Sequence, residues 1–355
     1  MKFEHKYPNA GSTQRFEFEY SYVTKTPKLG TCTLCRSFTK WLDVVFQVHA
    51  CSEECLSEMW RRYKADKESV GGIDNFGHHF KMVKEELLIA DNAREAWKDI
   101  LIVVHDQLDY LKQCIESVQA HSKNYHLYIW DNGSKPETAN YIESLMVSYD
   151  PDVHTDWAIT TIHSDTNTGF IFPNNELAAL GDSEYIILLN SDTKVFDKWD
   201  RAITGFMDGH PEVGLVGAWG GHMGADGRGF GGANGYEIDY VPGWCLAMRR
   251  SDYDKFGLFN KELQFAYCED ADLSLRMKEA GYKLYALHAP LVHHYQNKTI
   301  VEVEKEGQVD VRKSFDHNHA YIKERWKHYL EHERVLLKRR TDSHEPVSIA
   351  EPTSQ

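Results

Sequence analysis

Three carboxylates fall within four residues of this sequence, at Glu269, Asp270 and Asp272, and they begin a segment in which Leu273 and Met277 recur at helical spacing. The pattern predicts a helix with an acidic first turn. The helix macrodipole favours acidic residues there by roughly 0.3–1 kcal/mol, which accounts for one or two of the three. Carboxylates that crowd together also raise one another's pKa, and this would tune one of them toward work as a general base.

Three apolar runs upstream predict the sheet that positions this helix. Residues 100–104, 126–130 and 185–189 are each bounded by polar residues, as expected for parallel strands that are covered on both faces. Helical patterns lie between them, so the order is strand, helix, strand, helix, strand. This order predicts a doubly wound α/β sheet with its ligand at the carboxyl ends of the strands, and polar clusters follow the second and third runs.

Two further predicted strands flank the acidic helix start. Residues 241–250 are typical of a turn followed by a buried strand, and a later strand ends in His293 and His294. Successive side chains of a strand point to opposite faces, so only one of the two histidines can face a site. We favour His293, because a short apolar run leads directly into it, and His294 is the alternative.

Taken in order over residues 98–300, these motifs resemble family 2 of the GT-A-fold glycosyltransferases, and most closely its bacterial rhamnosyltransferase-like branch. The motifs are the strand ending in Val103-Val104, Asp-Asn-Gly-Ser at 131–134, Asn-Thr-Gly-Phe at 167–170, Leu-Asn-Ser-Asp at 189–192, Arg249-Arg250, Glu-Asp-Ala-Asp-Leu at 269–273, and His293. The resemblance implies a GT-A fold, which is Rossmann-like, with a mostly parallel central sheet and helices on both faces.

The resemblance implies an inverting glycosyltransferase that uses a nucleoside diphosphate sugar, most commonly a UDP- or dTDP-sugar. An acceptor nucleophile would attack the anomeric carbon opposite the diphosphate, and Asp270 would take its proton as general base. A divalent cation, Mn²⁺ or Mg²⁺, would neutralise the leaving diphosphate, held by Asp192 and by His293 or His294. The usual Asp-x-Asp metal motif begins here with Asn190, which leaves one fewer carboxylate.

Further residues at these strand ends are predicted to contact the donor or the acceptor. Asp131 can accept hydrogen bonds from a pyrimidine N–H or a ribose hydroxyl, and Gly133 lets the backbone approach closely. Trp244 offers an apolar face for a sugar ring, while Glu269 and Asp272 would shape the acceptor pocket or cap the helix. The other predicted nucleotide- or substrate-binding residues are His105, Asn132, Asn167, Gly169, Asn190 and Ser191.

Four cysteines precede the predicted catalytic domain in two close pairs, Cys32 with Cys35 and Cys51 with Cys55. This spacing satisfies the tetrahedral thiolate geometry of structural zinc, and the second pair is similar to the second knuckle of treble-clef zinc fingers. His49 is a rival ligand, and two disulfides are the competing interpretation. A closed four-thiolate zinc site would be structural and not catalytic.

Glycine dominates residues 220–235, and this composition predicts an irregular loop. Long irregular loops inside compact domains are often functional lids. We therefore expect this segment to order over the bound donor, close to the acceptor.

The chain has 355 residues and a formal net charge of −14, which argues against binding mainly through phosphate backbones or anionic lipid. No apolar run approaches the length of a membrane span and the first residues have no signal-peptide core, so we expect a cytoplasmic protein. The predicted domains are an N-terminal extension over 1–97 with a zinc-finger-like module at about 30–60, a GT-A domain over 98–300, a helical segment over 301–340 and a disordered tail over 341–355. The helical segment is expected to pack on the GT-A domain or on a second subunit in a homo-oligomer.

A second class of function stays open at this point. It is a non-catalytic protein that binds a nucleotide sugar or nucleic acid and acts through the zinc module, and Asn190 in the metal motif is what keeps it open. For an enzyme, the acceptor is equally undefined: a saccharide, a protein side chain and a modified base in DNA are the alternatives.

Overall fold

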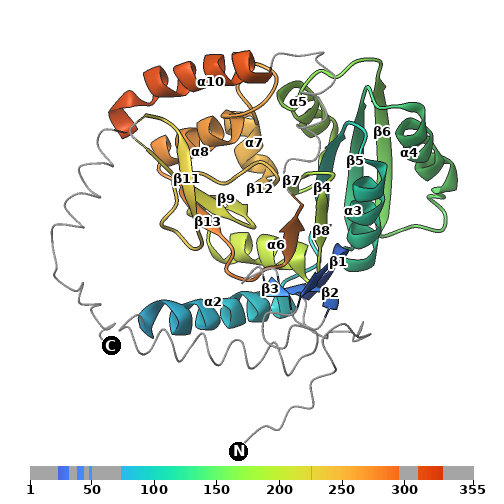
Figure 1. The fold of residues 1–355 in the computed structure, drawn as a ribbon, viewed down its shortest axis with the longest axis horizontal. Coiled ribbons are helices and arrows are strands. Elements are labelled where there is room, and N and C mark those ends of the chain that lie inside the picture. Colours follow the sequence, from blue (N-terminus) through green and yellow to red (C-terminus); the bar gives the residue numbers. More distant parts are fainter. Residues whose placement is uncertain are drawn as a thin grey trace, which may run out of the picture.

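The computed structural model of the protein describes residues 23–31, 38–43, 48–49, 73–224, 226–295 and 311–330 (Figure 1). The proposed zinc ligands Cys32, Cys35, Cys51 and Cys55 lie outside these residues, as does the predicted tail over 341–355. The first described strands, β1 (Val23–Thr31), β2 (Phe38–Asp43) and β3 (Val48–His49), form a separate antiparallel sheet in the order β1-β2-β3.

A seven-stranded sheet lies at the centre of the fold, in the order β13-β9-β12-β7-β4-β5-β6. Neighbouring strands pair in parallel except for β12, which is antiparallel to both β7 and β9. The arrangement confirms the predicted α/β fold with a mostly parallel central sheet. The strands are β4 (Lys98–Val104), β5 (Tyr125–Asn132), β6 (Trp157–Ser164), β7 (Tyr185–Leu189), β9 (Val213–Gly217), β12 (Cys245–Arg249) and β13 (Lys283–Ala286).

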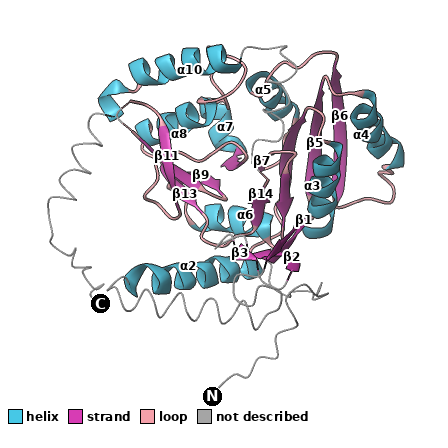
Figure 2. Ribbon diagram, viewed as in Figure 1, coloured by secondary structure: helices cyan, strands magenta, loops and turns pink. Residues whose placement is uncertain are grey.

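Side chains of β4 alternate between two hydrophobic cores, one on each face of the sheet. Ile100, Ile102 and Val104 enter one core, and Leu101 enters the other. Each fully buried aliphatic side chain contributes about 1.5–3 kcal/mol, which explains why the apolar runs predict these strands well. Figures 1 and 2 show the helices on both faces: α2 (Ile73–Asn92), α3 (Leu108–His121), α4 (Pro136–Ser148) and α6 (Trp199–Gly209) line the first core, and α5 (Ile171–Leu180), α7 (Arg250–Phe256) and α8 (Glu269–Glu279) line the second.

A short two-stranded ribbon lies beside the carboxyl end of β7. It pairs β8 (Thr193–Val195) with β14 (Val292–His294) in antiparallel register, so that His294 lies opposite Thr193. The backbone N–H of Tyr295 then donates to the carbonyl of Asp192 (2.9 Å). A segment from the end of the domain is thereby held against the predicted metal motif.

The glycine-rich segment is a β-hairpin, so the expectation of an irregular loop is wrong. β10 (Gly220–Met223) pairs antiparallel with β11 (Gly229–Ala233). A Cβ atom at Gly221 would lie 2.5 Å from the ring of Tyr240, and one at Gly229 would lie 2.6 Å from the Tyr240 hydroxyl. The glycines therefore permit close packing on an aromatic ring. None of the described residues of this hairpin lines the cavity described below. Ordering of this segment over a bound donor stays a prediction.

A C-terminal helix, α10 (Val311–Arg325), packs across α8 (Figure 1). Ile322 on α10, with Trp326 and Leu330 just beyond it, forms a small core with Leu275 of α8. The indole Nε1 of Trp326 also donates to Asp272 Oδ1 (3.0 Å). None of the helices in the described part of the chain combines the length and the hydropathy that a membrane span requires.

Candidate active site

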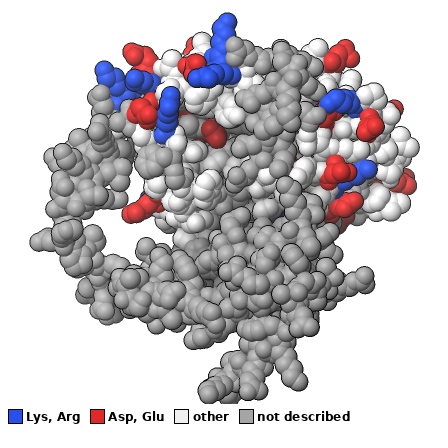
Figure 3. Space-filling model, viewed as in Figure 1, with Lys and Arg blue, Asp and Glu red and all other residues white. Residues whose placement is uncertain are grey.

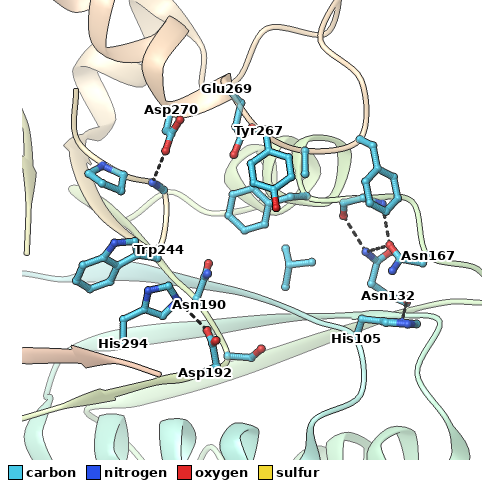
Figure 4. A pocket seen from close by; sticks show the side chains of 18 residues that line it. His105, Asn132, Asn167, Asn190, Asp192, Trp244, Tyr267, Glu269, Asp270 and His294 are labelled. Carbon is cyan, nitrogen blue, oxygen red and sulfur yellow. Dashed lines mark hydrogen bonds and ion pairs between the residues drawn. The ribbon is translucent and has the colours of Figure 1, made fainter. Parts of the chain in front are cut away.

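A cavity of about 250 Å³ opens at the carboxyl ends of β4, β5 and β7 and is closed on the far side by the start of α8 (Figure 4). Most of the predicted site residues line it: His105, Asn132, Asn167, Gly169, Asn190, Ser191, Asp192, Trp244, Glu269, Asp270 and His294. Four predicted residues do not: Asp131, Gly133, Asp272 and His293. Parallel strands end at one edge of the sheet, which is why residues far apart in the sequence converge here.

The metal motif and a histidine meet at one end of the cavity. The Nε2 atom of His294 lies 3.0 Å from Asp192 Oδ1, and the imidazole stacks on Trp244 with ring centroids 4.9 Å apart (Figure 4). Asn190 Oδ1 is buried and has no hydrogen-bond partner among the described residues. A buried oxygen left in this state costs about 1–3 kcal/mol, so a cation or a ligand group is expected to satisfy it.

These groups fit a divalent cation that takes further ligands from outside the chain. The carboxylate of Asp192, the amide oxygen of Asn190 and the imidazole of His294 are donors that Mn²⁺ accepts, and Mg²⁺ accepts the two oxygens. Within the described residues, no cluster of three His, Cys, Asp or Glu side chains could hold a metal by itself. Further ligands would therefore have to come from water or from a bound substrate.

The favoured histidine, His293, is not the one that faces the cavity. It pairs with Lys194 in the ribbon, and its ring packs edge-on against Tyr295 with centroids 4.6 Å apart. Burial, helped by the charges of His294 and Lys194, lowers the pKa of His293 to about 4. The prediction of His293 relied on the apolar run that precedes it. The histidine that points at Asp192 is instead determined by the register of the short β8–β14 ribbon.

Asn132 orders the loop on the opposite side of the cavity. Its Nδ2 donates to Asn167 Oδ1 (2.8 Å) and to the carbonyl of Gly169 (2.7 Å). Its Oδ1 accepts from the backbone N–H (2.8 Å) and the hydroxyl (2.9 Å) of Thr168, which is not among the site residues predicted from the sequence. His105 Nδ1 lies 3.0 Å from the Asn132 carbonyl. The hydrogen-bonding groups of the Asn132 side chain are thus used to shape the site.

Asp131 and Gly133 flank Asn132 in the sequence but do not line the cavity. Asp131 is 2% exposed, and its carboxylate accepts from the backbone N–H of Ser134 (3.0 Å) and lies 2.8 Å from His163 Nδ1. Gly133 has φ +73°, and a Cβ atom there would lie 2.7 Å from the backbone of Thr166. Both residues shape the turn after β5. The contact of Asp131 with a base or ribose stays a prediction.

Asp270 is aimed by two backbone N–H groups. Its Oδ2 accepts from Gly243 (3.0 Å) and its Oδ1 from Ala271 (2.8 Å). Burial raises the pKa of Asp270, and these two hydrogen bonds oppose the rise because they favour the carboxylate. A carboxylate with an elevated pKa in a cavity wall is suited to accept a proton.

Asp272 is separated from the cavity by the turn of the helix. It is fully buried, forms an ion pair with Arg276 (2.9 Å), and accepts from Trp326 Nε1. The expectation that Asp272 shapes the acceptor pocket is therefore not met. It holds α10 against α8, and its partner Trp326 lies too far along the sequence for the acidic motif alone to indicate the contact.

The turn 242–244 touches both ends of the cavity. The backbone N–H of Gly243 binds Asp270, and the carbonyl of Trp244 accepts from the backbone N–H of Asn190 (2.9 Å). The Trp244 ring in turn lies on His294. Two consecutive residues, Gly243 and Trp244, therefore connect the candidate base to the candidate metal ligands.

The loop before α8 has unusual backbone geometry. Phe265, Tyr267 and Cys268 have φ values of +51°, +74° and +70°. Such conformations cost of the order of 1–3 kcal/mol each for residues other than glycine, and they cluster at functional sites. Phe265 and Tyr267 line the cavity, although the sequence motifs assigned them no role.

Asn318 of α10 holds this loop in place. Its Nδ2 donates to the carbonyls of Gln264 (2.7 Å), Ala266 (3.0 Å) and Tyr267 (2.9 Å), and its Oδ1 accepts from the backbone N–H of Gln264 (2.7 Å). Asn318 is fully buried. No local pattern in the sequence marks it, because its partners lie more than fifty positions earlier in the chain.

Residues 99–257 match the family model described as glycosyl transferase family 2. A curated relative, the uncharacterized protein y4gI of Sinorhizobium fredii (strain NBRC 101917 / NGR234), is 26% identical over 262 residues, which are 64% of this chain and 27% of the relative. The chain therefore spans about a quarter of the length of this relative. The match to the family model ends before α8, so it does not include Asp270 or His294.

Solved glycosyltransferase structures resemble the fold. GalNAc-T7, crystallised with UDP, GalNAc and Mn²⁺, aligns with a TM-score of 0.50 at 14% identity, over 59% of this chain and 45% of that chain. The mannosyltransferase PcManGT from Pyrobaculum calidifontis, in complex with GDP-Man and Mn²⁺, aligns with a TM-score of 0.47 at 11% identity, over 76% of this chain and 85% of that chain. With the sheet order, the first likeness confirms the predicted GT-A fold. The chain thus contains a domain that matches glycosyl transferase family 2 and has a GT-A-like fold.

Proposed function

We propose that the protein is a metal-assisted, inverting glycosyltransferase that moves a sugar from a nucleoside diphosphate sugar to an acceptor nucleophile. The observation that supports this most strongly is that Asp270 and the pair formed by Asp192 and His294 line one cavity at the carboxyl ends of the sheet. The family match and the GT-A-like fold support the same class of reaction.

At the metal end of the cavity, Asp192 and His294, with Asn190 Oδ1, would hold the cation. When bound, Mn²⁺ or Mg²⁺ would neutralise the charge that develops on the leaving diphosphate. Because Asn190 replaces an aspartate, the chain contributes one negative charge fewer to the metal than the usual motif. The diphosphate is expected to carry more of the coordination, so that nucleotide and metal bind together.

At the opposite end, Asp270 would take the proton of the acceptor as the nucleophile attacks the anomeric carbon. The hydrogen bonds from Gly243 and Ala271 fix the direction of the carboxylate before the substrate arrives, and such pre-organisation is a main source of catalytic power. Attack from the side opposite the diphosphate inverts the configuration of the sugar. Trp244, whose ring lines the cavity, would contact the sugar ring.

The proposed donor is a UDP- or dTDP-sugar, with Asn167, Gly169 and Ser191 among the residues beside it. The rhamnosyltransferase-like branch and the acceptor, whether saccharide, protein or DNA base, stay predictions. On the face shown in Figure 3, the described basic side chains lie among acidic ones, and the chain has a net charge of −14. This charge favours a saccharide or protein acceptor over DNA, since DNA binding is driven mainly by phosphate contacts.

The test measures nucleoside diphosphate release from a panel of nucleotide sugars with Mn²⁺ and cell extract as a source of acceptors, and identifies products by mass spectrometry. Asp270→Asn is expected to lower release by about 10²–10⁴-fold, the range for a lost general base. The matched control is Asp254→Asn, at an exposed aspartate of α7, and it should keep wild-type release.

Two results would contradict the proposal. Full release by Asp270→Asn would show that the base is elsewhere. Binding of a nucleotide sugar without turnover, across all acceptors, would favour the non-catalytic binding protein that the substitution at Asn190 leaves open.

A further inference from the structure

The two adjacent carboxyl groups at the start of α8 have different surroundings. Asp270 receives two backbone hydrogen bonds, whereas Glu269 Oε2 is buried and has no hydrogen-bond partner among the described residues. Glu269 is only 6% exposed, and its side chain points into the cavity between Asp270 and Tyr267 (Figure 4). An ionised carboxylate is strongly disfavoured when it is buried with one oxygen left without a donor, and such a group tends to become neutral instead. A hydrogen bond from the backbone N–H of Glu269 itself favours the charged form, but burial and the charge of Asp270 outweigh it and raise the pKa.

Resting on the glycosyltransferase function above, we propose that Glu269 works as a neutral carboxylic acid that donates a hydrogen bond to a hydroxyl of the sugar being transferred. Its place supports this ligand, because Glu269 faces the space between the candidate base and Asn190 of the metal motif (Figure 4). The anomeric carbon must lie between those two groups during transfer. A protonated carboxyl group offers one donor and one acceptor, which suits a sugar hydroxyl.

The charges around Glu269 favour the neutral form. Burial, and after it the negative charge of Asp270, raises the pKa of Glu269 well above its ordinary value. No Lys or Arg among the described residues lines the cavity. The other titratable groups that line the cavity or precede Glu269 on its own loop are Tyr267, Cys268, His105, Asp192 and His294. The two neighbouring carboxyl groups would thus have different roles: ionised Asp270 would accept a proton, and neutral Glu269 would donate a hydrogen bond.

The first test reads the protonation state without any substrate. The infrared band of protonated carboxyl groups is compared at about pH 7, well above the ordinary glutamate pKa, in the wild type, in Glu269→Gln and in Glu143→Gln, which changes an exposed glutamate of α4. The band is expected in the wild type and in Glu143→Gln and should be reduced in Glu269→Gln. An unchanged band in Glu269→Gln would overturn the proposal.

The second test separates the sugar from the nucleotide. Binding of UDP and of UDP-glucose, UDP-N-acetylglucosamine and dTDP-rhamnose is measured by calorimetry with Mn²⁺. Glu269→Ala is expected to bind the preferred nucleotide sugar about tenfold more weakly, as for one lost hydrogen bond. Binding of UDP should not change. Glu269→Gln keeps a neutral donor of the same length, so its affinity should stay within about twofold of the wild type.

The outcomes distinguish this proposal from the function on which it rests. If Glu269→Gln loses as much affinity as Glu269→Ala, Glu269 acts as a carboxylate and the proposal fails while the glycosyltransferase function stands. Equal losses for UDP and for the nucleotide sugar would place Glu269 at the nucleotide and also overturn it. If the wild type binds none of these donors, the glycosyltransferase function fails, and the sugar ligand of Glu269 fails with it.

Discussion

Replacing Asn318 tests whether α10 belongs to the catalytic machinery. Asn318→Ala removes two N–H donors, which Nδ2 shares among three carbonyls of the 264–268 loop, and one acceptor for a backbone N–H. At about 0.5–1.5 kcal/mol each, these three groups stabilise the folded loop by about 1.5–4.5 kcal/mol. The left-handed conformations of Phe265, Tyr267 and Cys268 cost about 1–3 kcal/mol each. The two quantities are similar, so we expect the loop to lose its conformation when Asn318 is removed. Tyr267 would then leave the cavity wall, and α8 would lose its fixed start.

The assay combines hydrogen exchange of the 264–268 amides with turnover of the nucleotide sugar. Asn318→Ala should speed exchange and lower turnover at least about tenfold, which a loss of about 1.4 kcal/mol already produces. Asn318→Asp should be as damaging, because its carboxylate would face three carbonyl oxygens. His317→Ala, at an exposed neighbour on α10, is the matched control. Exchange and turnover in Asn318→Ala equal to those of the control would refute the reasoning.

Three further predictions concern the cavity. His294→Ala should weaken Mn²⁺ binding in the presence of UDP by about 10–100-fold, whereas His293→Ala should change it little; calorimetry that finds equal losses would contradict the placement of His294. Turnover should fall on the acidic side at a higher pH than the ordinary aspartate pKa of about 3.9 implies, because burial raises the pKa of Asp270, and a pH–rate profile that stays flat through this region would argue against a carboxylate base. Glu269→Gln should raise the Tm at about pH 8 and have a smaller effect near pH 4. The folded protein keeps a proton that the unfolded chain releases above about pH 4.3, so the stabilising contribution of Glu269 is complete below that pH and is lost as the pH rises toward its raised folded pKa; a Tm difference that does not depend on pH would count against this.

Local signals in the sequence were sufficient for the sheet and for most of the cavity wall. The apolar runs at 100–104, 126–130 and 185–189 lie within β4, β5 and β7, because strands covered on both faces must be apolar throughout. The helix predicted from the acidic cluster begins at Glu269 in the structure. The end of β7 places Asn190 at the carboxyl edge of the sheet, as the topology requires, and the start of α8 places Asp270 across the same cavity.

What the sequence did not indicate depends on contacts between distant segments. The choice between His293 and His294 is decided by the pairing of β14 with β8, almost a hundred residues earlier. Asp272 and Asn318 have roles that only the docking of α10 reveals. The composition of residues 220–235 wrongly predicted an irregular loop, because two of its glycines, Gly221 and Gly229, serve to accommodate the ring of Tyr240 within a β-hairpin.

The turn 242–244 has a consequence for the kind of substrate that can react. Gly243 binds the candidate base, and Trp244 contacts both Asn190 and the ring of His294. Under the proposed glycosyltransferase function, these two adjacent residues would set the distance between the leaving diphosphate and the nucleophile, and no movement of one lobe against another would be needed to create it. Such a fixed distance would exclude acceptors whose nucleophile cannot reach the anomeric carbon, even when the rest of the acceptor binds well. Inserting a single residue after Gly243 should accordingly uncouple donor binding from transfer while leaving both halves folded.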